Sequence, residues 1–138
     1  MSVAESSSGG LVSAALISIA GASSYFIGGG VIYSKEARRA LLGASKEITE
    51  MRTGTEKYAL IMASVVREKL DASWGLCELG ASGPRGNSFS DSACHVAVAL
   101  SGPRNISRTL ENGIEDREAN MWSFAEEALE LLREGWAG

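Results

Sequence analysis

Two periods of apolar residues run along the chain and predict alternating helices and strands. Apolar residues recur every three or four positions in some segments, whereas aromatic and β-branched residues cluster in others. The predicted helices are Leu11–Ala20, a segment from Ser34 to Leu42, a short helix after Ser45, a helix that Thr55 opens and a last helix from Glu115 on. The predicted strands are Ser2–Ala4, Tyr25–Tyr33, Ser73–Leu79, Ala93–Ser101 and Asn105–Leu110. This alternation favours an α/β domain built in layers.

Small and polar residues mark the ends of the predicted helices. We expect Ser34 to cap the second helix and Gly43 to end it. Gly21 is expected to close the first helix in the same way. The apolar face of that first helix is expected to consist of Val12, Ala15, Leu16 and Ile19.

Composition limits the chain to one domain and to few classes of partner. The 138 residues are 45% hydrophobic and 22% charged, which suits a single domain with its own core. The net charge of −4 and the lack of a basic face argue against a nucleic-acid partner. Cys77 and Cys94 are expected to be buried thiols rather than a disulfide, which favours an intracellular protein in the cytoplasm or an organelle. We expect no cofactor and no metal, because no Cys-x-x-Cys pair exists and the lone His95 reads as structural.

A run without charge extends from Ser6 to Ser34 and is rich in serine and glycine. Its serines and the triplet Gly28–Gly30 interrupt the continuous apolar stretch that a membrane span requires. We therefore expect no membrane contact and expect the run to line a ligand site. Membrane association through this run is kept as a third, weaker hypothesis.

Three loops of the chain are candidate ligand loops. Ligands of layered α/β domains gather beyond strand ends and at helix starts, where these loops are predicted to lie. They are SSSGG at residues 6–10, GASS at residues 21–24 and GASGPRG at residues 80–86. The first loop favours an anion cradle made of free backbone N–H groups at a helix start. The alternative is a serine cap followed by a glycine turn. Glu5, beside this loop, is expected to cap or orient it.

Ser23 is the candidate nucleophile among the hydroxyls of the run. A serine needs a base to lose its proton, and the partners near it in sequence are Tyr33, Lys35 and Arg38. A lysine serves as that base only when it is desolvated. The alternative is that Ser23 is an ordinary turn residue. Similarly, Arg117 either binds an anion or forms a surface ion pair with an acidic neighbour.

Taken in order, four segments resemble the C-terminal domain of the competence/damage-inducible protein CinA. They are VAESSSGG, IAGASSYFIGGGVIYSKEARRALLG, GASGP and EDRE. The likeness runs from about Val3 to the last helix. It implies one three-layer α/β/α domain over residues 1–138 with a mixed sheet. It also implies hydrolysis of the carboxamide of nicotinamide mononucleotide to nicotinic acid mononucleotide and ammonia, as in NAD metabolism.

The resemblance also assigns roles to residues of this chain. It implies that Ser23 attacks the amide while Tyr33 and the residue at position 38 assist. The residues that it places around the nucleotide are Ser6, Ser8, Gly9, Gly10, Gly80, Ala81, Gly83 and Arg117. Among these, Arg117 is the one expected to meet the phosphate.

Several positions depart from the family pattern. The pattern resembles YSNEAK, whereas this chain reads YSKEAR, so Arg38 stands where the family has a lysine. Arginine stays protonated and cannot take a proton from serine, although it can hold an anion or orient Tyr33. Lys35 shares a helix face with Arg38 and is the expected substitute. The loop after Gly80 carries Arg85 and fewer glycines than the family pattern, and the chain begins without the N-terminal helix that the resemblance implies.

Two hypotheses follow. The first is an amidase of the nicotinamide-nucleotide type, with weak activity or an altered substrate. The second is a catalytically impaired relative that binds a nucleotide or a partner protein. Both expect a homo-oligomer, because the uncovered sheet would leave apolar surface that needs a partner.

Overall fold

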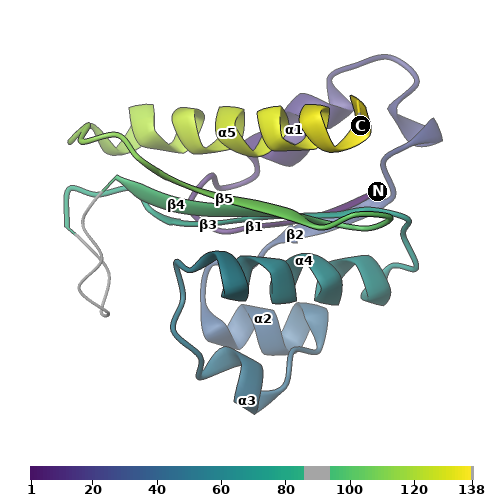
Figure 1. Ribbon diagram of the computed structural model, residues 1–138, viewed down its shortest axis with the longest axis horizontal. Helices are drawn as coiled ribbons and strands as arrows, with labels where there is room; N and C mark the ends of the chain where they lie inside the picture. Colours follow the sequence, from purple (N-terminus) through teal and green to yellow (C-terminus); the bar gives the residue numbers. More distant parts are fainter. Residues whose placement is uncertain (86–93, 138) are drawn as a thin grey trace.

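The computed structural model describes residues 1–85 and 94–137, and a five-stranded sheet lies at its centre (Figure 1). The strands run in the order β2-β1-β3-β4-β5. They span Ser2–Glu5 (β1), Gly28–Val31 (β2), Gly75–Ala81 (β3), His95–Ser101 (β4) and Ile106–Glu111 (β5). The helices span Leu11–Ile17 (α1), Lys35–Leu42 (α2), Lys46–Thr49 (α3), Glu56–Lys69 (α4) and Arg117–Ala137 (α5).

The sheet is mixed, as predicted. β1 pairs in parallel with both β2 and β3, whereas β3, β4 and β5 pair antiparallel. α1 and α5 cover one face of the sheet, and α4, with α2 and α3 beyond it, covers the other (Figure 1). The fold is therefore the three-layer α/β/α arrangement that the resemblance implied.

Side chains alternate between the two faces of the sheet and feed two separate cores. Val3, Leu76 and Phe124 belong to the core beneath α1 and α5. Ala4 and Cys77, which follow Val3 and Leu76 in their strands, belong to the core against α4. This period of two explains why the central strands are apolar at nearly every position.

The caps that the sequence predicts for α2 and α4 are present. The Ser34 hydroxyl accepts a hydrogen bond from the backbone N–H of Ala37 at 3.1 Å, and Gly43 ends α2 in the left-handed region with φ 68°. The Thr55 hydroxyl caps α4 by accepting from the N–H of Tyr58 at 3.1 Å. These local signals place α2 and α4 where the sequence predicts them.

The first helix is shorter than predicted. α1 ends at Ile17 and not at Ala20, and the Ser18 hydroxyl donates to the carbonyl of Ala15 at 2.6 Å. Such a local bond competes with the helix backbone and favours termination there. Gly21, with φ 87°, instead starts the short 3-10 turn Ala22–Ser24. Ile19 is consequently 61% exposed and does not join the apolar face of α1.

The strand predicted for Tyr25–Tyr33 is also shorter, since only Gly28–Val31 pairs with β1. Both cysteines are free and buried, as predicted. Within the described ranges, no helix is apolar over a length that would cross a bilayer.

A substitution at Gly75 tests how closely α4 packs on the sheet. A Cβ atom there would lie 2.1 Å from the carbonyl oxygen of Ala63 and 2.7 Å from the Cβ of Arg67. We predict that Gly75→Ala lowers the free energy of unfolding by about 1–3 kcal/mol, since the helix must move away. Urea unfolding measures the change.

Gly28→Ala is the matched control, because its new Cβ would meet only Leu70 Cδ1, at 3.7 Å. We expect a shift below about 1 kcal/mol for it. Equal losses in the two variants would contradict the close helix–sheet contact.

Candidate functional site

A crevice lies where the parallel strands end. β1, β2 and β3 all present their carboxyl ends at one edge of the sheet, where ligands of α/β proteins gather. Three adjoining hollows open there, with volumes of about 430, 220 and 320 Å³, and Tyr33 lines all of them. The 61% exposed side chain of Tyr33 therefore stands in the middle of the crevice.

The largest hollow, called here the main cavity, is bounded by β3 and its following loop together with Arg117. Its walls are formed by Ser7, Tyr33, Gly80, Ala81, Ser82, Gly83, Pro84, Arg85 and Arg117. The guanidinium of Arg117 donates to the Tyr33 hydroxyl at 3.2 Å and to the backbone carbonyl of Gly83. Arg117 thus connects the segment that follows β2 with the loop that follows β3, across the cavity. The surface ion pair considered as its alternative is absent from the described residues.

Ser82 adds an unusual group to the wall of the main cavity. Its side chain is 2% exposed, and its hydroxyl has no hydrogen-bond partner among the described residues. Buried hydroxyls are nearly always paired, so an orphaned one at a cavity wall marks a place for a ligand or water to bind. Its neighbours Gly80, Ala81 and Gly83, which the resemblance places around a nucleotide, line the same cavity.

Arg38 lines the second and third hollows and is 6% exposed. It donates to the backbone carbonyls of Ile32 at 3.1 Å and Tyr33 at 3.3 Å, and its guanidinium lies 5.6 Å from the ring centre of Tyr58. All these partners are neutral, and no carboxylate within the described ranges pairs with it. A buried cation without a counter-charge favours an anion in the adjoining hollow. The bond to the Tyr33 carbonyl also fits the predicted orienting role.

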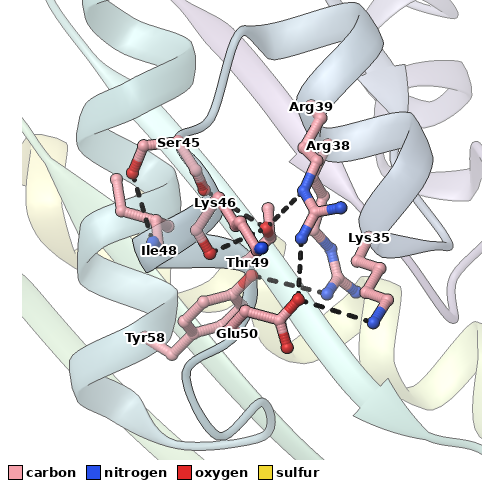
Figure 2. A network of polar contacts seen from close by, with 9 residues as sticks. All are labelled: Lys35, Arg38, Arg39, Ser45, Lys46, Ile48, Thr49, Glu50 and Tyr58. Atoms are coloured by element: carbon pink, nitrogen blue, oxygen red, sulfur yellow. Dashed lines mark hydrogen bonds and ion pairs between the residues drawn. The ribbon is translucent and has the colours of Figure 1, made fainter.

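Lys35 does not have the surroundings that a general base needs. Figure 2 shows its ammonium pointing toward Glu50, with an N–O distance of 3.6 Å, and its side chain is 49% exposed. Arg39 donates to the same carboxylate at 2.8 Å, and these two cations lower the pKa of Glu50. The expectation that Lys35 replaces a family lysine through desolvation is therefore wrong for this structure.

The first loop does not form the predicted anion cradle. Its backbone N–H groups are directed at two buried carboxylates of the chain itself. Glu5 accepts from Gly10, Val12 and Ser13 at 2.8–3.1 Å. Glu78 accepts from the N–H groups of Ser6 and Ser8, each at 2.9 Å. The prediction of free N–H groups is thus wrong, whereas the capping role of Glu5 is confirmed.

The two carboxyl groups are neighbours on one face of the sheet. Glu5 and Glu78 stand opposite each other in the β1–β3 register, and both are fully buried. The Ser8 hydroxyl lies 2.7 Å from an oxygen of each. Burial raises the pKa of Glu78 above its ordinary value near 4.5, although four hydrogen bonds from the loop act in the opposite sense. Burial therefore favours the protonated form of Glu78.

The remaining predicted site residues of this loop are divided. Ser6 lines the second hollow, next to Arg38. Ser8 is fully buried between the carboxyl groups, and neither it nor Gly9 nor Gly10 lines a hollow of the crevice. Within one chain, only Ser6 of these four is thus placed to touch a ligand there.

Ser23 lies at the opposite end of the sheet. It is exposed and lines a separate cavity of about 450 Å³ with Met1, Trp74 and Trp136, at the amino ends of β1 and β3. One chain therefore does not bring Ser23 to Tyr33 or Arg38.

His95 is held within the structure, as predicted. Its Nδ1 lies 2.9 Å from a Glu111 carboxylate oxygen, and its Nε2 lies 2.7 Å from the carbonyl of Gly54. No group of three or more histidine, cysteine or acidic side chains in residues 1–85 and 94–137 could hold a metal ion.

Glu78 and Ser7 are the residues that the sequence reading missed. The signal was a single acidic residue inside the apolar strand Gly75–Ala81, aligned with Glu5. A carboxyl group in a central strand needs hydrogen-bond donors, and the loop at residues 6–8 supplies them.

Comparisons with known proteins agree with the fold and the motifs. Residues 1–135 match the model of the CinA C-terminal domain. The chain is 34% identical over 137 residues to a CinA-like protein of Gloeobacter violaceus, covering 96% of this chain and 32% of that protein. It is 36% identical over 138 residues to a CinA-like protein of Synechococcus, with 96% and 33% covered. The chain thus spans about a third of these relatives or less.

Solved structures give the same picture. The competence/damage inducible protein CihA from Agrobacterium tumefaciens is 29% identical, with a TM-score of 0.86 over 96% of this chain and 82% of that one. The competence damage-inducible protein A from Klebsiella pneumoniae is 25% identical, with a TM-score of 0.89 over 99% and 85%.

The raised pKa of Glu78 predicts that the free energy of unfolding depends on pH. Above about pH 4.5 the unfolded chain releases a proton that folded Glu78 retains, so the free energy of unfolding falls as pH rises toward the raised pKa of the folded state. Glu78→Gln removes this contribution and flattens the curve. Urea unfolding between about pH 4 and about pH 8 measures it.

Glu68→Gln, at an exposed position, is the control and should follow the wild-type curve. Parallel curves for the wild type and Glu78→Gln would contradict the assignment of the proton to Glu78.

Proposed function

Because the chain belongs to the CinA C-terminal domain family, we propose that it hydrolyses the carboxamide of nicotinamide mononucleotide, releasing ammonia and nicotinic acid mononucleotide. The observation that carries the proposal is the cluster of Tyr33, Arg117 and Ser82 around one cavity at the strand ends. The motif likeness supplies the substrate class, and the crevice supplies groups that suit it.

Two arginines give the crevice the charge that a nucleotide phosphate needs. Arg117 stands at the wall of the main cavity, where its remaining N–H groups can bind the phosphate. Arg38 lies at the far side of Tyr33 with neutral partners only among the described residues. In this proposal Arg38 stabilises the negative charge that develops on the amide oxygen during attack. Arginine suits that role because it keeps its charge throughout.

The amide would lie where the main cavity and the second hollow meet. Tyr33 and Gly80 line both hollows, so their common boundary is the floor of the reaction site. The absence of a side chain at Gly80 allows the ligand to approach the backbone. Arg117 and Arg38 position Tyr33 from either side, through its hydroxyl and its carbonyl.

A second copy of the chain would bring Ser23 to this crevice. β2 is the edge strand next to β1. Ile27 just before it, Val31 at its end and Tyr33 two residues beyond it are 56%, 45% and 61% exposed. Antiparallel pairing of two copies of β2 about a two-fold axis sets the amino end of one strand beside the carboxyl end of the other. Ser23 of one copy then approaches Tyr33 of the other. We therefore propose a homodimer that shares its sites.

The second candidate function is nucleotide binding without turnover. Arg38 in place of a lysine, together with the paired and half-exposed Lys35, favours this reading, because neither side chain is set up to accept a proton.

The first prediction for the amidase tests turnover directly. Purified protein should release ammonia from nicotinamide mononucleotide, and Ser23→Ala and Tyr33→Phe should each reduce kcat/KM about 10²–10⁴-fold. Ser24→Ala, next to Ser23, is the matched control and should retain activity. Activity unchanged in Ser23→Ala would remove Ser23 from the mechanism.

Mixing the two inactive variants tests whether the site is shared. Mixed dimers of Ser23→Ala and Tyr33→Phe contain one intact site, so activity should return on mixing. A monomer by light scattering, or no recovery from mixed dimers, would overturn the shared site.

The binding alternative predicts a different pattern. Calorimetric titration would then show both mononucleotides binding with no ammonia released. Arg38→Lys should raise turnover at least about tenfold if the arginine alone has disabled the site. No gain in Arg38→Lys, with binding intact, would place the defect elsewhere.

A further inference from the structure

Ser7 stands between the main cavity and the buried carboxyl group of Glu78. Ser7 lines the cavity, and its hydroxyl is in hydrogen-bond contact with Glu78 Oε1. A Cβ atom on Gly80, which also lines the cavity, would lie 2.8 Å from Ser7 Oγ. The hydroxyl therefore lies against the cavity floor while holding the carboxyl group behind it.

The hydrogen bonds of Glu78 leave one oxygen for a proton. Oε2 already accepts from the N–H groups of Ser6 and Ser8 at 2.9 Å and lies 2.7 Å from the Ser8 hydroxyl. Oε1 has only the hydroxyl of Ser7 as a contact among the described residues. The ionised group accepts from the Ser7 hydroxyl at Oε1, whereas a proton carried on Oε1 would be donated to Ser7 Oγ.

In this arrangement the Ser7 hydroxyl can either accept a hydrogen bond from Glu78 or donate one to it. When Glu78 is protonated, it donates to Ser7, and the hydrogen of the Ser7 hydroxyl is free to point into the cavity. When Glu78 is ionised, Ser7 donates to it and presents a lone pair to the cavity instead. A proton taken up at one side of Ser7 can thus be released at the other.

We propose that Glu78 exchanges a proton with the ligand of the main cavity through the Ser7 hydroxyl, so that the two residues act as a general acid–base relay. This inference rests on the proposed amidase function. The proton that the Ser23 hydroxyl loses on attack passes to solvent in the open crevice. As the C–N bond breaks, Ser7 gives its proton to the leaving nitrogen, which departs as ammonia, and takes the proton of Glu78 Oε1. When water attacks the acyl intermediate, its proton passes through Ser7 back to Glu78, and the departing Ser23 Oγ takes a proton from solvent, which restores both residues.

The surroundings of Glu78 fit this work. Burial raises its pKa, while the N–H groups of Ser6 and Ser8 stabilise the carboxylate left after transfer. The other titratable groups near it are Glu5, which shares Ser8, and Cys77, whose thiol pKa burial also raises. Glu5 receives three backbone N–H bonds and contacts no cavity group, so it does not compete for the role.

Ser13 provides a matched control. Its hydroxyl donates to buried Glu5 at 2.7 Å, the same chemistry as Ser7 and Glu78, but it lines no hollow of the crevice. Any effect of losing a serine–carboxyl bond as such should be shared by Ser7→Ala and Ser13→Ala.

The first experiment needs no substrate. After a rapid pH drop, the infrared carbonyl band that is lost in Glu78→Gln reports protonation of Glu78 in the whole protein. We expect Ser7→Ala to slow this protonation at least about tenfold, because the relay is removed, and Ser13→Ala to leave it unchanged. Equal rates in the wild type and Ser7→Ala would overturn the relay, whether or not the protein is an amidase.

The second experiment measures the pH profile of kcat/KM for nicotinamide mononucleotide. Ser7→Ala and Glu78→Gln should lower it about 10²–10⁴-fold and remove the same limb of the profile, while Ser7→Thr should restore most of it. A wild-type profile in either Ser7→Ala or Glu78→Gln would overturn the proposal. A slowed pH-jump response in Ser7→Ala, together with no amidase activity in the wild type, would instead uphold the relay and reject the substrate.

Discussion

Two buried carboxyl groups, Glu5 and Glu78, lie in register on neighbouring strands and share the hydroxyl of Ser8. Between them they accept from five backbone N–H groups that follow β1, those of Ser6, Ser8, Gly10, Val12 and Ser13. Buried carboxyl groups are costly unless hydrogen bonds satisfy them, so the loop closes over the pair. That closure starts α1, sets Ser6 and Ser7 at the crevice, and leaves the loop's dipoles facing inward.

The hydrogen bonds that Glu5 and Glu78 accept also limit which groups of the crevice can bind an anion. An anion cannot use the N–H groups that the two carboxyl groups occupy, so the guanidinium groups that line the crevice are left to meet negative charge on a ligand. They are those of Arg38 and Arg117, with Arg85 at the wall of the main cavity. Arg38 and Arg117 also hold Tyr33, by its carbonyl and its hydroxyl. The crevice is thus prepared for a small anionic ligand, with hydroxyls rather than a lysine available for proton transfer.

Local signals were enough to predict most of the fold. Ser34, Gly43 and Thr55 cap or end helices through bonds with near neighbours, and such bonds are visible in sequence. The site was less predictable, because it depends on contacts across the sheet. Glu78 meets Ser7 over 71 positions of sequence, and nothing local to either residue indicates that pairing. The family motifs identified Tyr33 and Arg117 but could not place Ser23, which lies at the other end of its own sheet.

We propose that the crevice at the carboxyl ends of β1, β2 and β3 binds a nicotinamide-type mononucleotide. A crystal structure with nicotinic acid mononucleotide would show this binding and its contacts. We expect the phosphate at Arg117, the carboxylate of the ring between Tyr33 and Arg38, and the Ser7 and Ser82 hydroxyls in contact with the ligand. A ligand bound only in the cavity beside Trp74 and Trp136, or no bound nucleotide at saturating concentration, would contradict the account.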